Sequence, residues 1–190
     1  MLNLIFFGPP GAGKGTQALK VAQYYGLRHV STGNIFREEI RQNTKLGLKV
    51  KDILANGDLV PDKLLIKILE NTCHNSPDSN GFVFDGIPRT LRQAEALDNM
   101  MRHKKSSVNR VISLEVPEDE LIRRLVIRSQ EQGRTDDTLE VIQRRLDIYH
   151  QHTKPLVDFY RKQGIFVEIP GIGRIEDVFQ TICRTIDASG

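Results

Sequence analysis

A glycine-rich stretch near the amino terminus, GPPGAGKGT at residues 8–16, constrains the fold of this chain more than any other feature. It follows an apolar run at residues 2–7 that predicts a β-strand, and it fits the G-x-x-x-x-G-K spacing of a phosphate-binding loop between a strand and a helix. Glycines at these positions let backbone N–H groups point toward a polyphosphate, and the following helix directs its positive N-terminus at the same anion. Lys14 adds a point charge, so the sequence favours a nucleoside triphosphate site over an ordinary glycine-rich turn.

The position after Lys14 bears on how a metal ion would be bound. Many loops of this kind carry there a Ser or Thr that binds Mg²⁺ directly, whereas this chain has Gly15 and places its hydroxyl one residue later, at Thr16. Asp85 is the nearest downstream carboxylate at the end of a predicted strand, although Asp85 and Gly86 alone are equally typical of a turn. We expect Mg²⁺ to arrive with the nucleotide, without a direct protein ligand, and Asp85 to act on it through water.

Short apolar runs alternate with longer stretches of helical periodicity along the whole chain. The runs lie at residues 2–7, 29–30, 81–84, 110–116 and 165–169. This alternation predicts one α/β domain over residues 1–190, in which helices cover both faces of a parallel sheet.

Two prolines mark predicted helix starts. Pro61 and Pro117 stand before helix-like stretches at residues 62–73 and 118–128, where the fixed φ of proline is tolerated. The polar residues 129–133 then interrupt the helical pattern. We interpret this interruption as a mobile flap.

Charge and cysteine content restrict the partners and the compartment. The chain has 27 basic and 24 acidic side chains, a balance that does not predict binding of nucleic acid. Cys73 and Cys183 lie far apart without a metal-site spacing, which favours free thiols in a reducing compartment such as the cytoplasm. The sequence has no apolar stretch of membrane-spanning length, so we expect no membrane partner.

Arginines cluster between residues 123 and 145, and a solvated helix face is the simplest interpretation of such a cluster. Helical angles separate them: Arg124 and Arg128 flank the apolar stripe of their predicted helix, whereas Arg123 points away from it. In the next predicted helix Arg145 falls inside the apolar sector and Arg144 outside it. Arg124 and Arg128 can reach a cleft beside the core, whereas the inward Arg145 needs an anionic partner, for which we expect phosphate.

Five stretches of this sequence, in this order, resemble motifs of the adenylate kinases. They are GPPGAGKGTQ at 8–17, STGNIFR at 31–37, GDLVPD at 57–62, FVFDGIPR at 82–89 with Gln93, and GRTDD at 133–137. The resemblance implies a three-layer α/β/α fold of the P-loop NTPase type with a five-stranded parallel sheet. It also implies a helical insertion at residues 31–60 that binds the nucleoside monophosphate, and a short lid at residues 127–137 without a cysteine cluster or structural zinc.

The resemblance further implies a reversible phosphoryl transfer from Mg-ATP to AMP that gives two ADP, by a monomeric enzyme. The catalytic residues that it assigns are Lys14, Asp85, Arg89, Arg128, Arg134 and Arg145. Those assigned to ATP are Gly11, Ala12, Gly13, Lys14, Gly15, Thr16, Arg124, Arg128 and Gly173. Those assigned to AMP are Thr32, Arg37, Asp58, Leu59, Val60, Gly86, Ile87, Pro88, Arg89, Gln93, Arg134 and Arg145.

Two residues depart from the family pattern. Asn34 replaces the aspartate that most members have after Thr-Gly, and it is able to cap a helix in its place. Ile87 stands where Phe or Tyr is commoner. None of the five histidines, His29, His74, His103, His150 and His152, is needed as a general base, and we expect them at the surface or in packing positions.

Other functions remain open at this point. A UMP/CMP kinase would carry Ala in place of Thr32 and Asn in place of Gln93, and a glutamine amide suits the donor and acceptor edge of adenine. Gln93 could also be an ordinary solvated helix residue. A GTPase switch would need an Asn-Lys-x-Asp motif, which is absent, and a non-catalytic nucleotide sensor would have lost charges that this chain retains.

Overall fold

The computed structural model describes residues 1–76, 79–132 and 138–188. Strands and helices alternate along the chain, which is the order predicted for an α/β protein. In chain order the elements are β1 (Leu2–Phe7), α1 (Lys14–Tyr25), β2 (Arg28–Ser31), α2 (Thr32–Arg41), α3 (Lys45–Ala55), α4 (Asp62–His74), β3 (Gly81–Asp85), α5 (Leu91–His103), β4 (Arg110–Glu115), α6 (Glu118–Gln132), α7 (Leu139–Ile148), the π-helical turn η1 (Tyr149–Thr153), α8 (Leu156–Lys162), β5 (Phe166–Pro170) and α9 (Ile175–Asp187).

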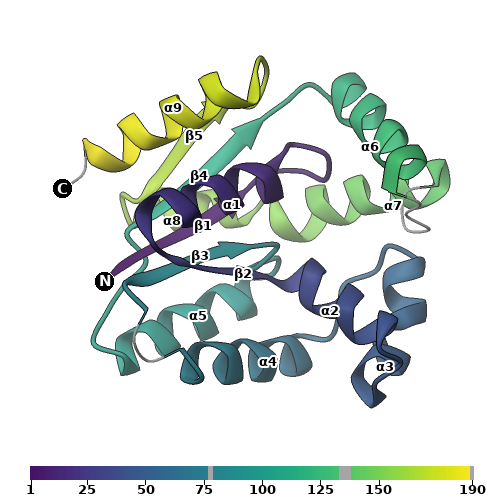
Figure 1. Ribbon diagram of the computed structural model, residues 1–190, viewed down its shortest axis with the longest axis horizontal. Coiled ribbons are helices and arrows are strands. Elements are labelled where there is room, and N and C mark those ends of the chain that lie inside the picture. The colour runs from purple at the N-terminus through teal and green to yellow at the C-terminus, as the bar shows by residue number, and fades with distance from the viewer. Residues whose placement is uncertain (77–78, 133–137, 189–190) are drawn as a thin grey trace.

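The five strands form one parallel sheet with the order β2-β3-β1-β4-β5. All of the apolar runs that predict strands are strands in the structure, with boundaries that move by one or two residues. The predicted fold class is therefore confirmed: a five-stranded parallel sheet between two layers of helices (Figure 1).

The central strand β1 separates two hydrophobic cores, because its side chains alternate between the faces of the sheet. Leu4 and Phe6 belong to the core on the side of α1 and α9. Ile5 and Phe7 belong to the core on the side of α4, α5 and α8. All four side chains are at most 2% exposed, so β1 is buried on both faces, as the uninterrupted apolar run predicts.

The carboxyl ends of the strands gather the chain segments that are candidates for function. Parallel pairing aligns Phe6 with Asp85 and Ser31 with the same residue, so β1, β2 and β3 end together. The loop at residues 8–16 follows β1, which lies between β3 and β4 and therefore at the point where the strand order reverses. Such switch points are the usual ligand sites of open α/β sheets. In Figure 1, α2, α3, α6 and α7 lie on this side of the sheet.

The structure corrects the predicted interruption after residue 128. Helix α6 continues through Gln132, because the glutamines and the glutamate of this stretch are good helix formers despite their polarity. Polar character alone does not end a helix. The rest of the expected lid, residues 133–137, lies outside the described residues, as does Arg134.

Cys73 and Cys183 are free, as the sequence predicts, and both are buried. Burial raises the pKa of the Cys73 thiol to about 11. Among the described residues, no helix combines the length and the apolar character that a membrane span requires.

Candidate functional site

The glycine-rich loop wraps around the start of helix α1. Gly13 has a φ of 91°, in the left-handed region that glycine adopts without strain, and it turns the chain into α1 at Lys14. The Lys14 ammonium lies inside this loop and donates to the carbonyl oxygens of Gly8 and Pro9, each at 2.7 Å. The loop thus holds its own cation at the positive end of a helix dipole, where a polyphosphate would bind.

The electrostatic surroundings of Lys14 favour its neutral form. Burial lowers the pKa of this ammonium to about 7; Asp85 opposes the shift, while Arg89, Arg145 and Arg128 add to it. The guanidinium groups named here come from three different parts of the chain, so positive charge converges on one point. An arriving polyphosphate would relieve that repulsion and favour the charged lysine.

Asp85 ends β3 beside the loop. Its Oδ2 atom accepts a hydrogen bond from the Ser31 hydroxyl at 3.1 Å and lies 3.8 Å from Nε2 of His29. Burial by itself would raise the pKa of the Asp85 carboxyl, but His29 and Lys14 hold that pKa below its ordinary value. The carboxylate therefore stays ionised at neutral pH.

The residues around Asp85 fit a hydrated Mg²⁺ that arrives with a nucleotide. A Cβ atom on Gly15 would lie 3.4 Å from the Asp85 carboxylate, in ordinary van der Waals contact, so glycine at that position leaves more room between the loop and the carboxylate. The Thr16 hydroxyl group and the Asp85 carboxylate are the hard oxygen ligands that Mg²⁺ prefers, directly or through water.

Two adjoining pockets open at this end of the sheet. The loop pocket is lined by the glycine-rich loop together with Asp85, Arg37, Arg124 and Arg128. The inner pocket is lined by residues after β3 and by Gly57, Leu59, Ile148, Tyr149 and Thr153. Both pockets share Pro10, Lys14, Gly86, Arg89 and Arg145. We call the two together the cleft.

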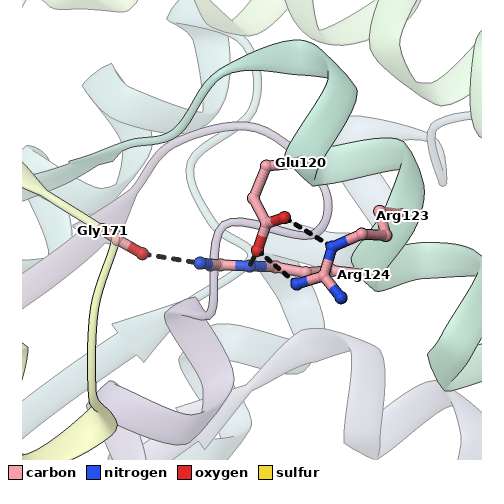
Figure 2. A network of polar contacts seen from close by, with 4 residues as sticks. All are labelled: Glu120, Arg123, Arg124 and Gly171. Carbon is pink, nitrogen blue, oxygen red and sulfur yellow. Dashed lines mark hydrogen bonds and ion pairs between the residues drawn. The ribbon is translucent and has the colours of Figure 1, made fainter.

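The arginines of α6 lie on the sides that their helical angles predict. The side chain of Arg123 is 63% exposed and points away from the cleft, whereas that of Arg124 is 26% exposed and lines the loop pocket. Figure 2 shows Glu120 between them: Arg124 Nε donates to this carboxylate at 2.7 Å, and Arg124 also donates to the carbonyl oxygen of Gly171 at 3.0 Å. The pair Arg123 and Arg124 holds the pKa of Glu120 near 2. Arg124 thus joins α6 to the loop after β5.

The two arginines of α7, Arg144 and Arg145, also lie on different sides of their helix. Arg145 lines both pockets, while the half-exposed Arg144 turns outward and donates from Nε to the Asp58 carboxylate at 2.7 Å. The Asp58 side chain, a candidate for AMP, therefore lies in an outer groove beside α7, outside the cleft. Its neighbour Leu59 does line the inner pocket.

On helix α2, Arg37 reaches the loop pocket with Asn34 beside it. Asn34 does not cap this helix, which begins after Ser31; its side-chain oxygen instead accepts a hydrogen bond from Arg37 at 2.7 Å. The predicted capping role of Asn34 is therefore wrong, because β2 runs directly into α2 and leaves Asn34 inside the first turn. An asparagine here orients the arginine without neutralising it.

Gly86 lies where the two pockets meet and joins α2 to Arg89. Its carbonyl oxygen accepts from the Thr32 hydroxyl at 3.1 Å and from Arg89 Nε at 2.9 Å. Its φ is 79°, and a Cβ atom there would lie 2.8 Å from the Thr32 hydroxyl oxygen. Any side chain at this position would displace the groups that orient Arg89.

Most of the remaining candidates lie outside these two pockets. Gln93 is 1% exposed, with both of its amide atoms bonded to protein groups, and it lines neither pocket. Ala12 and Val60 are buried, at 2% and 5% exposed, and Gly173 belongs to the loop before α9. Ile87 and Pro88 line the inner pocket beside Arg89.

His29 corrects the prediction for the histidines, because it lines the loop pocket next to Asp85. Its Nε2 atom is buried and has no hydrogen-bond partner among the residues that the structure describes. A sequence signal was available: His29 precedes Ser31 by two residues on β2, and residues two apart on a strand share a face.

The loop pocket, which suits a polyphosphate, thus adjoins the inner pocket, and the cations Lys14, Arg89 and Arg145 line both. This arrangement on a five-stranded parallel sheet is that of a P-loop nucleoside monophosphate kinase. Within this class, the family model described as Adenylate kinase matches residues 6–165. The chain belongs to the adenylate kinase family.

Curated relatives agree over nearly their whole length. The chain is 44% identical to an adenylate kinase of Bacteroides thetaiotaomicron, across 98% of this chain and 99% of the relative. It is 46% identical to an adenylate kinase of a Cyanothece species and 42% identical to one of Porphyromonas gingivalis, each across 98% of this chain and 96% of the relative. The family resemblance predicted from the five motifs is confirmed.

Proposed function

We propose that this protein transfers a phosphoryl group reversibly from Mg-ATP to AMP and so forms two ADP. The observation that carries the proposal is the sharing of Lys14, Arg89 and Arg145 by two adjoining pockets. A site for one nucleotide would need cations in one pocket alone. Cations between two pockets suit a phosphoryl group that passes from one nucleotide to the other.

In this proposal the ATP phosphates lie along the glycine-rich loop, and AMP lies between Arg37 and the residues after β3. Lys14, Arg124 and Arg128 face the donor, Arg37 faces the acceptor phosphate, and Arg89 and Arg145 lie between them. Helices α2 and α3 then form the AMP-binding insertion at residues 31–60. Arg134, the remaining candidate, lies outside the described residues.

Charge neutralisation is the main catalytic task that this site would perform. Two unit negative charges 4 Å apart repel each other by about 4 kcal/mol at an effective dielectric constant of 20. The convergent guanidinium groups and the loop N–H donors offset this repulsion and stabilise the charge on the transferring group. Mg²⁺ bound to the nucleotide supplies further neutralisation of the phosphate oxygens.

No protein base is required for the transfer, because the attacking phosphate of AMP is already an oxyanion near neutral pH. Catalysis then depends on position: the two nucleotides must meet in line, and water must be excluded as a competing acceptor. Closure of the elements around the cleft over both nucleotides would provide this exclusion.

An acceptor panel tests the proposal. We expect coupled ADP-release assays with Mg-ATP to give high kcat/KM for AMP and values at least about a hundredfold lower for CMP, UMP, GMP and dTMP, since buried polar groups reject a base with the wrong edge. A preference for UMP or CMP would identify a pyrimidine nucleotide kinase. Tight binding of ATP and AMP without ADP formation would identify a nucleotide sensor.

We also propose that the enzyme acts as a monomer in the cytoplasm. The two free buried thiols support a reducing compartment.

A further inference from the structure

Two side chains bond the main chain of Arg89, one from Gln93 nearby in the sequence and one from the distant Thr153. Its N–H donates to Oε1 of Gln93 at 2.7 Å. Its carbonyl oxygen accepts from the Thr153 hydroxyl at 3.0 Å. Arg89 lines both pockets of the cleft, so whatever fixes its backbone also fixes the origin of a guanidinium that faces both nucleotides in the proposed function.

The hydrogen bond from the N–H of Arg89 to Gln93 depends on Asp62, which lies in the first turn of α4. Oδ1 of Asp62 accepts from Gln93 Nε2 at 2.6 Å and from the Thr90 hydroxyl at 3.1 Å. A carboxylate only accepts hydrogen bonds, so the nitrogen of the Gln93 amide must face Asp62. The amide oxygen is thereby directed at the N–H of Arg89, which only donates.

Asp62 also lies at the junction between the segment that contains α2 and α3 and helix α4. It follows Pro61, where the segment containing α2 and α3 returns to the core, and Thr90 is the N-cap of α5, with its side chain accepting from the Gln93 N–H at 3.2 Å. The carboxylate thus connects the start of α4 to the start of α5, two helices that also share one hydrophobic core.

The hydrogen bond to the carbonyl oxygen of Arg89 comes from Thr153 in the π-helical turn η1. The N–H of Lys154 bonds to the carbonyl of Tyr149, five residues earlier, so this turn is wider than an α-helical one. Thr153 is 7% exposed, and its hydroxyl leaves the helix to reach Arg89. Such turns are rare and occur frequently at functional sites.

We propose that Asp62 and Thr153 are positioning residues for Arg89, acting as a clamp on its main chain. Asp62 sets the orientation of the Gln93 amide, and Thr153 holds the carbonyl group, so that the arginine side chain starts from one fixed backbone position. The catalytic part of this proposal rests on the function proposed above. The clamp itself is a property of the protein without nucleotide.

Substitution of Thr153 by Val tests the clamp, because it removes the hydroxyl and keeps the shape. We expect kcat with ATP and AMP to fall about tenfold, since displacements well under 1 Å are already costly in pre-organised sites, while KM for ATP stays within about twofold. Thr153→Ser should recover most of the loss. Amide hydrogen exchange at Arg89, measured by NMR, should be faster in Asp62→Ala, because this N–H is held by Gln93, whose amide Asp62 orients.

Thr72→Val is the matched control. Thr72 also donates its hydroxyl to a main-chain carbonyl, that of Ile68 at 2.8 Å, but within α4 and outside the cleft. Equal losses of kcat in Thr153→Val and Thr72→Val would overturn the proposal, as would unchanged exchange at Arg89 in Asp62→Ala. If the wild-type protein forms no ADP, the proposed function fails, while the exchange measurement still decides whether the clamp exists.

Discussion

At the residue scale, Lys14 shows how the fold prepares a cation for an anion. The Lys14 ammonium is buried. Among the described residues, it donates hydrogen bonds to two carbonyl oxygens of its own loop, and three arginines repel it. Its pKa of about 7 lies far below that of a free lysine. Between pH 7 and the ordinary lysine pKa the unfolded chain binds more protons at this group, so its contribution makes the free energy of unfolding rise with pH.

The lowered pKa of Lys14 predicts proton uptake on nucleotide binding. At pH 8 the Lys14 side chain of the free protein is mostly in its neutral amine form. A bound triphosphate restores its positive charge, so about one proton is taken up per ATP. Titration calorimetry in buffers of different ionisation enthalpy measures this uptake. Lys14→Met should abolish it, and Lys20→Met, on the same helix but paired with Glu176, should not. Binding of ATP at pH 8 without proton exchange would contradict the prediction.

Arg89→Ala separates catalysis from folding. We predict that kcat/KM falls by about a hundredfold to a thousandfold, the usual effect of removing one pre-organised charge-stabilising group. The free energy of unfolding should change by less than about 1 kcal/mol, since alanine keeps the main-chain groups that Gln93 and Thr153 bind.

Arg41→Ala is the control for this substitution, because Arg41 is 75% exposed and pairs with Glu38 on the outer side of α2. Steady-state kinetics and urea unfolding of both variants give the comparison. A loss of stability in Arg89→Ala that accounts for the loss of turnover would make Arg89 a structural residue.

At the element scale, α2 and α3 form a tightly packed helical pair. A Cβ atom on Gly47 of α3 would lie 2.1 Å from the carbonyl oxygen of Glu39, so the two helices approach each other at a point that only glycine permits. Thr44 caps α3 by accepting from the Gly47 N–H at 3.0 Å. Because Arg37 is carried by α2, the packing of this pair sets the position of a cation in the cleft.

Gly47→Ala should therefore disturb one side of the cleft selectively. We predict a KM for AMP that rises about tenfold, a KM for ATP that changes little, and a free energy of unfolding that falls by about 1–3 kcal/mol, as overpacking usually costs. Initial rates with each substrate varied in turn give the two constants. Leu48→Ala, at the adjacent and 63% exposed residue, is the control. Equal increases in both KM values would contradict the assignment of α2 and α3 to the acceptor.

At the scale of the whole molecule, the cleft is assembled from segments that meet only in the fold. The loop after β1, the segment after β3, and helices α2, α6 and α7 each contribute lining residues. Elements that contribute to a shared site are held together more firmly when ligands occupy it. Two nucleotides should therefore stabilise α2, α3 and the end of α6 jointly.

A bisubstrate mimic, two adenosines joined by a polyphosphate long enough to span both pockets, tests this coupling. We predict that hydrogen exchange slows in α2, α3 and the last turn of α6 to a greater extent with the mimic than with ATP or AMP alone. Exchange mass spectrometry of the three states provides the measurement, with α9, which contributes no residue to either pocket, as the internal reference. If the mimic neither binds nor inhibits, the two-pocket arrangement is wrong.

The sequence by itself determined the sheet, the phosphate loop, and the sides on which Arg123, Arg124, Arg144 and Arg145 lie. These features depend on chain periodicity and on the sterics of glycine, which act between residues close together in the sequence. Only the tertiary structure decided that His29 faces Asp85, that Arg144 holds Asp58, and that Thr153 holds the carbonyl group of Arg89. Those contacts join residues on different elements, and their distances follow from how helices and strands pack together, which no local pattern encodes.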